Sequence, residues 1–244
     1  MAVNKVGTID DWVRVDTVLA SVSDKTGLDT LARGLLRVNP RITVLSTGGT
    51  FTALHQALGA AAEGGIRAAT EGGIRAAGSR LRQVSDYTGQ PEMQGGLVKT
   101  LDFKIYLGLL SETYNPAHSE DLERTGASAI DMVVVNLYPF EKTVAAPDCT
   151  LEDARATIDI GGPCMVRAAA KNFHRVAVLA DPADYPAVLL ELEGNRGAVS
   201  LATRWRLARK AFDLIARYDA AIAAYLQGEV TPQAPGLYEV RHGA

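Results

Sequence analysis

Short apolar runs alternate with amphipathic segments along most of this chain of 244 residues. The apolar runs are rich in β-branched residues and predict strands at 15–22, 41–45, 81–84, 105–110, 130–137 and 176–179. Segments with helical spacing predict helices at 28–36, 50–58, 116–124, 151–157, 182–192 and 200–226. Strands that alternate with helices form parallel sheets through right-handed crossovers. The pattern therefore predicts an α/β fold, a parallel sheet flanked by helices, in one domain over 15–226.

Three segments fall outside this pattern. Residues 1–14 are expected to form a lead-in, and the stretch at 227–244, which contains Pro and Gly residues, is expected to form a C-terminal tail. Inside the domain, the sequence EGGIRAA occurs at 63–69 and again at 71–77. Two copies are too few for a solenoid. We expect a surface insertion over 63–77 that arose by local duplication.

The composition argues against several classes of protein. A net charge of −3 gives no general attraction to nucleic acid. The two cysteines form no disulfide framework or metal motif, and the four histidines are scattered, so no metal site is expected. No segment has the pattern of a signal peptide or a membrane span. We therefore expect a cytoplasmic protein that binds neither nucleic acid nor a membrane.

A glycine pair, Gly161 and Gly162, precedes a predicted helix in which Pro163 suits the first helical position. Such a helix start directs free N–H groups at its neighbour, usually an anion. Asp159 precedes the pair, and Lys171 shares one helix face with an arginine four residues earlier. These charges favour a site for a charged ligand that undergoes proton transfer. A capped core helix with a solvated basic face remains the alternative.

Polar loops follow the first two predicted strands, at 21–27 and 46–50. Because parallel strands end at the same edge of a sheet, both loops should lie at one ligand-binding edge. Their hydroxyls, glycines and Lys25 suit a phosphate, although neither loop has the nucleotide P-loop pattern. Lys99, which follows another glycine pair, and Tyr138, which precedes a proline, are further candidates. A surface lysine and a packing tyrosine are the alternative interpretations of these two residues.

The predicted helix at 200–226 carries four basic residues. We expect them to form a solvated or subunit-facing surface rather than a nucleic-acid site. They are Arg204, Arg206, Arg209 and Lys210.

Nine motifs in this order resemble a known family, the IMP cyclohydrolase domain. That domain is the N-terminal half of the bifunctional AICAR formyltransferase/IMP cyclohydrolase, and the resemblance spans about 17–226. The motifs are SVSDKTG at 21–27, STGGT at 46–50, VSDYTG at 84–89, PEM at 91–93, VKTL at 98–101, NLYPF at 136–140, IDIGG at 158–162, RAAAKN at 167–172 and KAF at 210–212.

The resemblance implies a methylglyoxal-synthase-like fold with additional C-terminal helices, and a homodimer. It also implies an activity, the last step of de novo purine biosynthesis. In that step 5-formamidoimidazole-4-carboxamide ribonucleotide (FAICAR) closes to inosine monophosphate (IMP) with loss of water. No cofactor or metal is implied. No formyltransferase half is expected here, so a separate AICAR formyltransferase becomes a candidate partner.

The resemblance also assigns roles to residues. It gives a catalytic set of Lys99, Tyr138, Asp159 and Lys171. It gives a substrate-binding set of Ser23, Asp24, Lys25, Thr47, Gly48, Gly49, Thr50, Val98, Thr100, Val135, Asn136, Ile160 and Gly161.

Some positions leave the mechanism open. Either Lys171 or Asp159 could be the group that transfers the proton. A helix of eight residues spans roughly 12 Å, so their contact requires that Asp159 fold back or that the helix begin later.

This chain departs from the usual family pattern at a few positions. The family usually has arginine where this chain has Leu97, His-Pro where it has Asp and Phe at 102–103, and a histidine near Tyr106.

Two other functions share the fold and the phosphate loops. A non-catalytic module that binds purine nucleotides for regulation would keep the loops without turnover. A phosphate-eliminating lyase of the methylglyoxal synthase type would instead form methylglyoxal from dihydroxyacetone phosphate.

Overall fold

The computed structural model describes residues 5–62, 69–70, 73–74, 80–91 and 99–228. Its centre is a five-stranded sheet with the order β6-β3-β2-β7-β8. Each neighbouring pair in this sheet is parallel, as the alternation of strands and helices predicted. The strands are β2 (Thr17–Val22), β3 (Thr43–Ser46), β6 (Arg80–Gln83), β7 (Met132–Asn136) and β8 (Ala177–Leu179).

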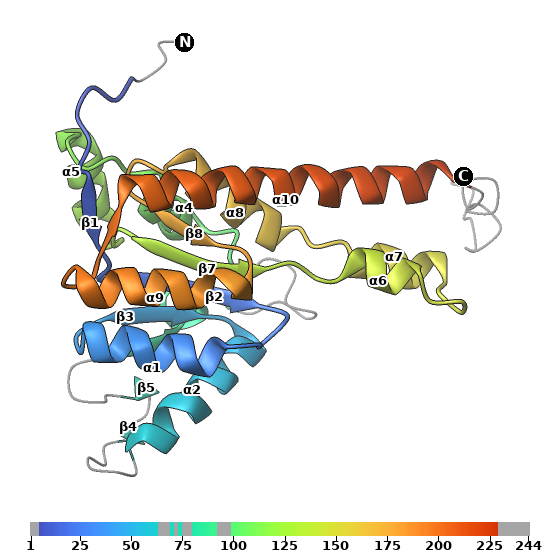
Figure 1. Cartoon of the computed structure of the whole chain (residues 1–244), viewed down its shortest axis with the longest axis horizontal. Helices are drawn as coiled ribbons and strands as arrows, with labels where there is room; N and C mark the ends of the chain where they lie inside the picture. The colour runs from blue at the N-terminus through green and yellow to red at the C-terminus, as the bar shows by residue number, and fades with distance from the viewer. Residues whose placement is uncertain (1–4, 63–68, 71–72, 75–79, 92–98, 229–244) are drawn as a thin grey trace.

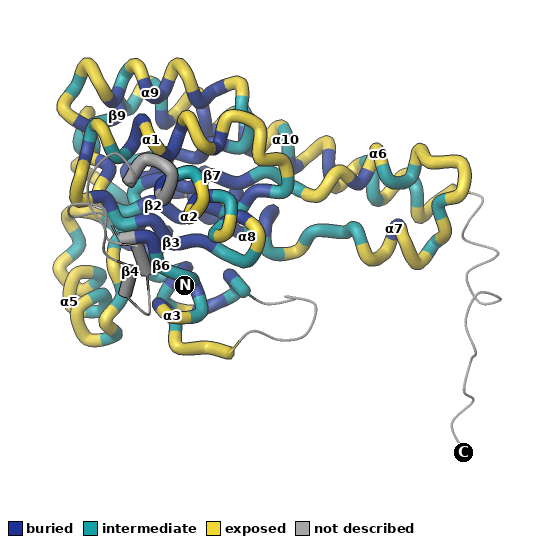
Figure 2. Tube along the Cα trace, turned by 90° about the horizontal axis from the view of Figure 1, so that it is seen from below, coloured by how far each residue is buried: buried dark blue, intermediate teal, exposed yellow. Residues whose placement is uncertain are grey.

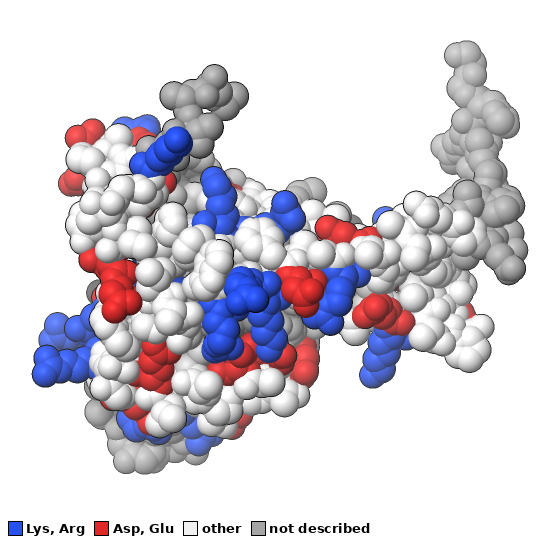
Figure 3. Space-filling model, turned by 45° about the horizontal axis from the view of Figure 1, so that its top comes forward, with Lys and Arg blue, Asp and Glu red and all other residues white. Residues whose placement is uncertain are grey.

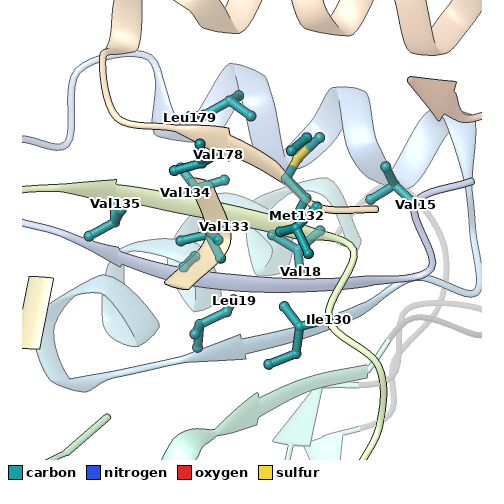
Figure 4. Packing of buried hydrophobic residues seen from close by; sticks show 14 of the residues in the cluster. Val15, Val18, Leu19, Ile130, Met132, Val133, Val134, Val135, Val178 and Leu179 are labelled. Atoms are coloured by element: carbon teal, nitrogen blue, oxygen red, sulfur yellow. The ribbon is translucent and has the colours of Figure 1, made fainter. Parts of the chain in front are cut away.

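The central strands β2 and β7 supply much of the hydrophobic core. Val133 and Val134 are almost fully buried, and they pair in register with Leu19 and Ala20 of β2. Figure 4 shows the side chains of these strands packed on both sides of the sheet, with Met132 near Val18. A strand that is buried on both faces has a continuous apolar sequence, which explains why this part of the sheet could be predicted.

Two groups of helices cover the sheet. Helix α1 packs against α2 and α9, whereas α8 packs against α4 and α10. Figures 1 and 2 show α1 and α9 on one face of the sheet and α8 on the other. These covering helices are α1 (Leu28–Val38), α2 (Gly48–Ala62), α4 (Phe103–Leu110), α8 (Gly161–Lys171), α9 (Tyr185–Gly194) and α10 (Leu201–Gln227). Helices α3 (Val84–Thr88) and α5 (Pro116–Thr125) and the 3₁₀ turn η2 (Pro182–Asp184) also belong to this part.

The strand predicted at 105–110 is wrong, because these residues belong to helix α4. The side chain of Asp102 accepts a hydrogen bond of 2.7 Å from the backbone N–H of Lys104 and so caps the helix. Gly108 allows the helix to approach the carbonyl oxygen of Ser128, which would lie 2.5 Å from an added Cβ. A short apolar run does not by itself distinguish a buried strand from a buried helix.

The basic residues at the start of α10 do not form one solvated patch. Arg204 is fully buried, which corrects the prediction for this residue. Arg206 and Lys210 form ion pairs with Asp184, at 2.8 and 2.7 Å respectively. Figure 3 shows basic and acidic side chains next to one another on one face of the molecule. Arg209 is exposed, as predicted.

Buried Arg204 joins the N-terminal segment to the body of the domain. Strand β1 (Trp12–Arg14) pairs with β9 (Ala198–Ser200) in antiparallel fashion beside it. The guanidinium of Arg204 donates to five carbonyl oxygens, and these distances lie between 2.5 and 3.0 Å. The acceptors belong to Asp10, Asp11, Phe173, His174 and Val199.

An arm projects from the sheet body (Figures 1 and 2). We define the arm as α6 (Phe140–Val144), α7 (Leu151–Thr157) and the outer half of α10. It has its own small cluster of buried side chains, Phe140, Ala154 and Tyr218. The segments 137–139 and 158–160 connect the arm to β7 and α8, so the arm is joined to the body next to the carboxyl edge of the sheet.

Part of the predicted insertion forms a two-stranded ribbon. Strand β4 (Ala69–Thr70) pairs with β5 (Gly73–Ile74), and the remainder of 63–77 lies outside the described residues. Most of the predicted tail, 229–244, also lies outside them. Among the helices that the structure describes, none is both long enough and apolar enough to cross a membrane.

Replacing Arg204 by alanine should lower the free energy of unfolding by about 3 kcal/mol or more, because buried carbonyl oxygens lose their donor. The matched control is Arg209→Ala, which changes an exposed arginine on the same helix and should stay within about 0.5 kcal/mol of the wild type. Urea denaturation measures both. Equal small effects would show that the Arg204 contacts do not stabilise the fold.

Candidate functional site

The loops after β2 and β3 are joined by hydroxyl groups at the carboxyl edge of the sheet. Thr50 Oγ1 accepts from the backbone N–H of Val22 and donates to its carbonyl oxygen, both at 3.0 Å. The hydroxyls of Ser21 and Thr47 lie 2.9 Å apart. The two polar loops are therefore held side by side, as the parallel topology predicted.

Asn136, at the end of β7, fixes the first of these loops. Its side-chain oxygen accepts from the backbone N–H groups of Ser23 and Asp24, at 2.6 and 2.8 Å. Its side-chain nitrogen donates to the carbonyl oxygen of Asp24 at 2.9 Å. Ser23 Oγ also donates a hydrogen bond of 2.7 Å to the carbonyl oxygen of Leu137. One amide side chain thus determines how the Ser23–Asp24 turn faces the site.

The charged residues of this loop have perturbed pKa values. Partial burial lowers the pKa of Lys25, although nearby Asp24 opposes this effect. The Lys25 ammonium donates to the carbonyl oxygens of Val22 and Ser23. The hydroxyl and backbone N–H of Thr26 donate to the Asp24 carboxylate and lower its pKa. Lys25 is thus a cation hydrogen-bonded to neutral oxygens, which favours the approach of an anion such as phosphate.

Lys99 and Thr100 lie between the N-termini of two helices. A Cβ added to Gly48, at the start of α2, would lie 3.1 Å from Lys99 Nζ. A Cβ added to Gly161, at the start of α8, would lie 2.9 Å from Thr100 Oγ1. Thr100 is buried. Helix N-termini carry partial positive charge and free N–H groups, so this arrangement suits an anionic ligand.

Asp159 caps the start of α8 and is largely buried. Its Oδ1 accepts from the backbone N–H of Gly162 at 2.8 Å. Burial raises the pKa of Asp159, while hydrogen bonds from the backbone N–H groups of Gly162 and Tyr138 act in the opposite direction. A carboxyl group with a raised pKa next to a helix N-terminus is suited to accept or hold a proton.

Other predicted site residues differ in how exposed they are and in which of their atoms could contact a ligand. Tyr138 and Ile160 are 51% and 57% exposed, and they lie on the two segments that lead to the arm. The side chain of Val135 is buried in the core, so only its backbone could contact a ligand. Gly49 has open space where a Cβ would be. Val98 and Leu97 lie outside the described residues.

Lys171 is not brought to this edge of the sheet. Helix α8 begins at Gly161, two residues before Pro163, and Lys171 is its last residue. The two ends of such a helix are about 15 Å apart. Lys171 is exposed, and its ammonium has no ion-pair partner within the described part of the chain. Asp159 does not fold back along α8, and α8 does not begin later than Gly161. Asp159 and Lys171 of the same chain therefore do not contact each other.

Three residues that shape the site are not among those predicted from the sequence. Ser21 contacts Thr47, and Leu137 contacts Ser23. Tyr218 of α10 contacts the backbone of Asp159. Ser21 and Leu137 lie inside the motifs at 21–27 and 136–140, whereas Tyr218 has the position of an ordinary core residue on a long helix.

No cluster of three or more metal-binding side chains occurs among the residues that the structure describes. The described site offers hydroxyls, backbone N–H groups, the ammonium groups of Lys25 and Lys99, and the carboxyl groups of Asp24 and Asp159. These groups suit a phosphorylated ligand that also has a polar part.

Comparison with known proteins gives two matches to family models. The model of the AICARFT/IMPCHase bienzyme matches residues 169–242, and the model of the MGS-like domain matches residues 68–164. The protein in "Crystal structure of ForH" is 34% identical, with a TM-score of 0.66, and the match covers 86% of this chain and 97% of that one. This chain contains regions that match the AICARFT/IMPCHase bienzyme and MGS-like models, and it belongs to one family with the protein of that crystal structure. Its predicted fold, a methylglyoxal-synthase-like α/β sheet with C-terminal helices, is confirmed.

The curated relatives carry the name "Bifunctional purine biosynthesis protein PurH". The protein from Neisseria meningitidis serogroup A is 46% identical over 87% of this chain and 36% of its own length. The protein from Chlorobium phaeovibrioides is 48% identical over the same shares. The chain spans about a third of the length of these relatives, and it is homologous to proteins named for purine biosynthesis.

The raised pKa of Asp159 predicts how Asp159→Asn changes stability with pH. The Asp159 carboxyl binds its proton more tightly in the folded state than in the unfolded state. The wild type therefore loses stability as pH rises from 3.8, the ordinary pKa of the group, through its raised pKa in the folded state. Asparagine does not titrate. The stability of Asp159→Asn relative to the wild type should therefore increase between about pH 4 and pH 7.

Asp153→Asn is the matched control with the opposite sign. Hydrogen bonds from Thr150 lower the pKa of Asp153, so its carboxylate stabilises the fold above its ordinary pKa and loses this effect as pH falls. This variant should lose stability relative to the wild type as pH rises to about 4, near the ordinary value of 3.8, and should show no further change above that pH. Urea denaturation at several pH values tests both, and the same slope for the two variants would contradict the assignment.

Proposed function

We propose that this chain is an IMP cyclohydrolase, which closes the ring of FAICAR to IMP with loss of water. The observation that carries the proposal is the pair of helix N-termini that Lys99 and Thr100 bridge, with Asp159 at the start of the second helix. The phosphate of the substrate would bind at the N-terminus of α2, and its base would bind at the N-terminus of α8. The homology to PurH proteins supports the same assignment.

The reaction joins two groups of one substrate molecule. The carboxamide nitrogen attacks the formyl carbon, and the formyl oxygen leaves as water. One hydrogen of that water comes from the carboxamide nitrogen and the other from the formamide nitrogen. An amide nitrogen is a weak nucleophile, so holding both groups in attack geometry supplies much of the rate. The enzyme must also accept a proton from nitrogen and donate one to the leaving oxygen.

The site residues suit these tasks. In our proposal Ser23, Asp24, Lys25 and the 47–50 loop bind phosphate and ribose, together with Thr100. Asn136, Ile160 and the backbone of Val135 and Gly161 lie along the base. The carboxyl group of Asp159, with its raised pKa, takes the proton from the carboxamide nitrogen. Lys99 stabilises the negative charge that develops on the formyl oxygen, and Tyr138 holds an oxygen of the substrate.

Lys171 enters this proposal through a second copy of the chain. In a two-fold dimer, α8 of one copy would run antiparallel to α8 of the other. That packing brings Lys171 of each copy beside the α8 N-terminus, and therefore beside Asp159, of the other copy. It would supply the acid that protonates the leaving oxygen.

The surface around α8 supports such a dimer. Ile160 and Phe212 are 57% and 41% exposed, and the Arg167 guanidinium lies 5.9 Å from the Phe212 ring centroid. Trp205 is 49% exposed and its ring contacts Phe173, just after α8, at 4.7 Å between centroids. Large exposed apolar side chains that gather on one face are typical of an interface.

A non-catalytic module that binds purine nucleotides is the second candidate, and the position of Lys171 within one copy favours it. Calorimetry with IMP, together with a turnover assay with FAICAR, separates the two functions. A module would bind IMP but would form none from FAICAR. In the catalytic case an AICAR formyltransferase would supply FAICAR.

Purified protein should convert FAICAR to IMP, followed by absorbance and chromatography. Lys99→Met should lower kcat by about 10²–10³-fold, because it removes a group that stabilises the developing oxyanion. Lys25→Ala should mainly raise KM, because it removes a phosphate contact. Lys142→Met, on the exposed side of α6, is the control and should behave as the wild type. No IMP above the spontaneous rate would contradict the proposed function.

Mixing two inactive variants tests the role of Lys171. Asp159→Asn and Lys171→Ala should each lose about 10²–10⁴-fold in kcat. After subunit exchange in an equal mixture, heterodimers contain one intact site, and activity should return to about a quarter of the wild-type value. Melting curves confirm that both variants fold. No recovery after exchange, or normal turnover by Lys171→Ala alone, would exclude a contribution from the second copy.

A further inference from the structure

We propose that Tyr218, on the arm, is a positioning residue that holds Asp159 in its productive orientation. This inference rests on the proposed function of Asp159. The backbone N–H of Asp159 donates to the Tyr218 hydroxyl oxygen at 2.8 Å. The same hydroxyl lies 3.4 Å from the carbonyl oxygen of Thr157, to which it donates. Tyr218 therefore bridges two backbone groups of the segment that leads into α8.

The bridge matters because Asp159 lies just before a helix start. Backbone N–H groups there have no partner within the helix, and a partly buried one needs another acceptor. The Tyr218 hydroxyl supplies that acceptor for Asp159. If the peptide at Asp159 rotated, its carboxyl group would leave the N–H groups of Gly162 and Tyr138. A small displacement of a group that contacts the substrate is enough to reduce the rate.

The aromatic cluster of the arm fixes Tyr218 itself. Tyr218 is only 8% exposed, and its ring meets Phe140 edge to face, with centroids 6.2 Å apart. Phe140 follows Tyr138 and Pro139 in the chain, and its N–H donates to the carbonyl oxygen of Tyr138 at 2.8 Å. The same cluster thus touches the segment that carries Tyr138 and the segment that carries Asp159.

This arrangement makes the arm part of the site. The outer half of α10 lies more than 50 residues along the chain from Asp159, yet it supplies the hydroxyl that Asp159 contacts. Figure 1 shows α10 running alongside the connection between α7 and α8. Burial raises the pKa of Tyr218, with a further contribution from the Asp159 carboxylate, so the hydroxyl stays protonated and able to donate to Thr157 at neutral pH.

Tyr218→Phe tests the inference, because it removes the hydroxyl and keeps the ring. We expect kcat for FAICAR to fall about 10- to 100-fold, with KM changed by less than about twofold. The acidic limb of the pH profile of kcat should also move, since it reports the ionisation of Asp159. The matched control is Tyr225→Phe, whose ring contacts Phe140 at 5.8 Å in the same cluster. Tyr225→Phe should keep the wild-type kcat and pH profile.

A second measurement does not depend on turnover. Amide hydrogen exchange followed by NMR should show faster exchange of the Asp159 N–H in Tyr218→Phe and unchanged exchange in Tyr225→Phe. If the wild type formed no IMP, the proposed function would fail, while this exchange difference would still show whether Tyr218 holds the peptide. Wild-type kcat and pH profile in a folded Tyr218→Phe protein would overturn the inference. So would equal losses in the two variants, because they would assign the effect to packing of the arm.

Discussion

The candidate site depends on how closely Asp159 approaches the glycine pair that begins α8. A Cβ added to Gly162 would lie 2.5 Å from Asp159 Oδ2 and 2.8 Å from Leu137 Cδ2, so any larger residue there would displace these two side chains. This absence of a side chain lets the carboxyl group cap the helix. A Cβ added to Gly48 would lie 3.1 Å from Lys99 Nζ, a tight contact, and Gly48 also has a positive φ of 38°. Two glycines therefore determine where the charged side chains of the site can lie.

The rest of the fold keeps these close contacts in place. The parallel sheet brings the ends of β2, β3 and β7 to one edge, and the hydroxyl of Thr50 and the amide of Asn136 fix the loops there. The arm adds support from the other side, through Tyr218 and Phe140. Because strand ends, helix starts and the arm each contribute, the site needs nearly the whole domain, although each contact is local.

The sequence predicted the strand–helix alternation and most candidate residues, because these depend on local periodicity and on loops at strand ends. It did not predict α4, since the short apolar run at 105–110 suits a strand or a helix and the Asp102 cap decides between them. It assigned Arg204 to a surface, because the carbonyl oxygens that bury it come from distant segments. Tyr218 was missed for the same reason, and only the length of α8 in three dimensions separates Lys171 from Asp159.

A crystal structure with bound IMP tests the central claim most directly, because it locates each part of the ligand. The account predicts that the phosphate lies against the N-terminus of α2, near Lys25 and Thr50. It also predicts that the base lies at the start of α8, with its ring within hydrogen-bond distance of Asp159. A nucleotide bound elsewhere on the chain, or bound with its phosphate at α8 and its base at α2, would contradict the account.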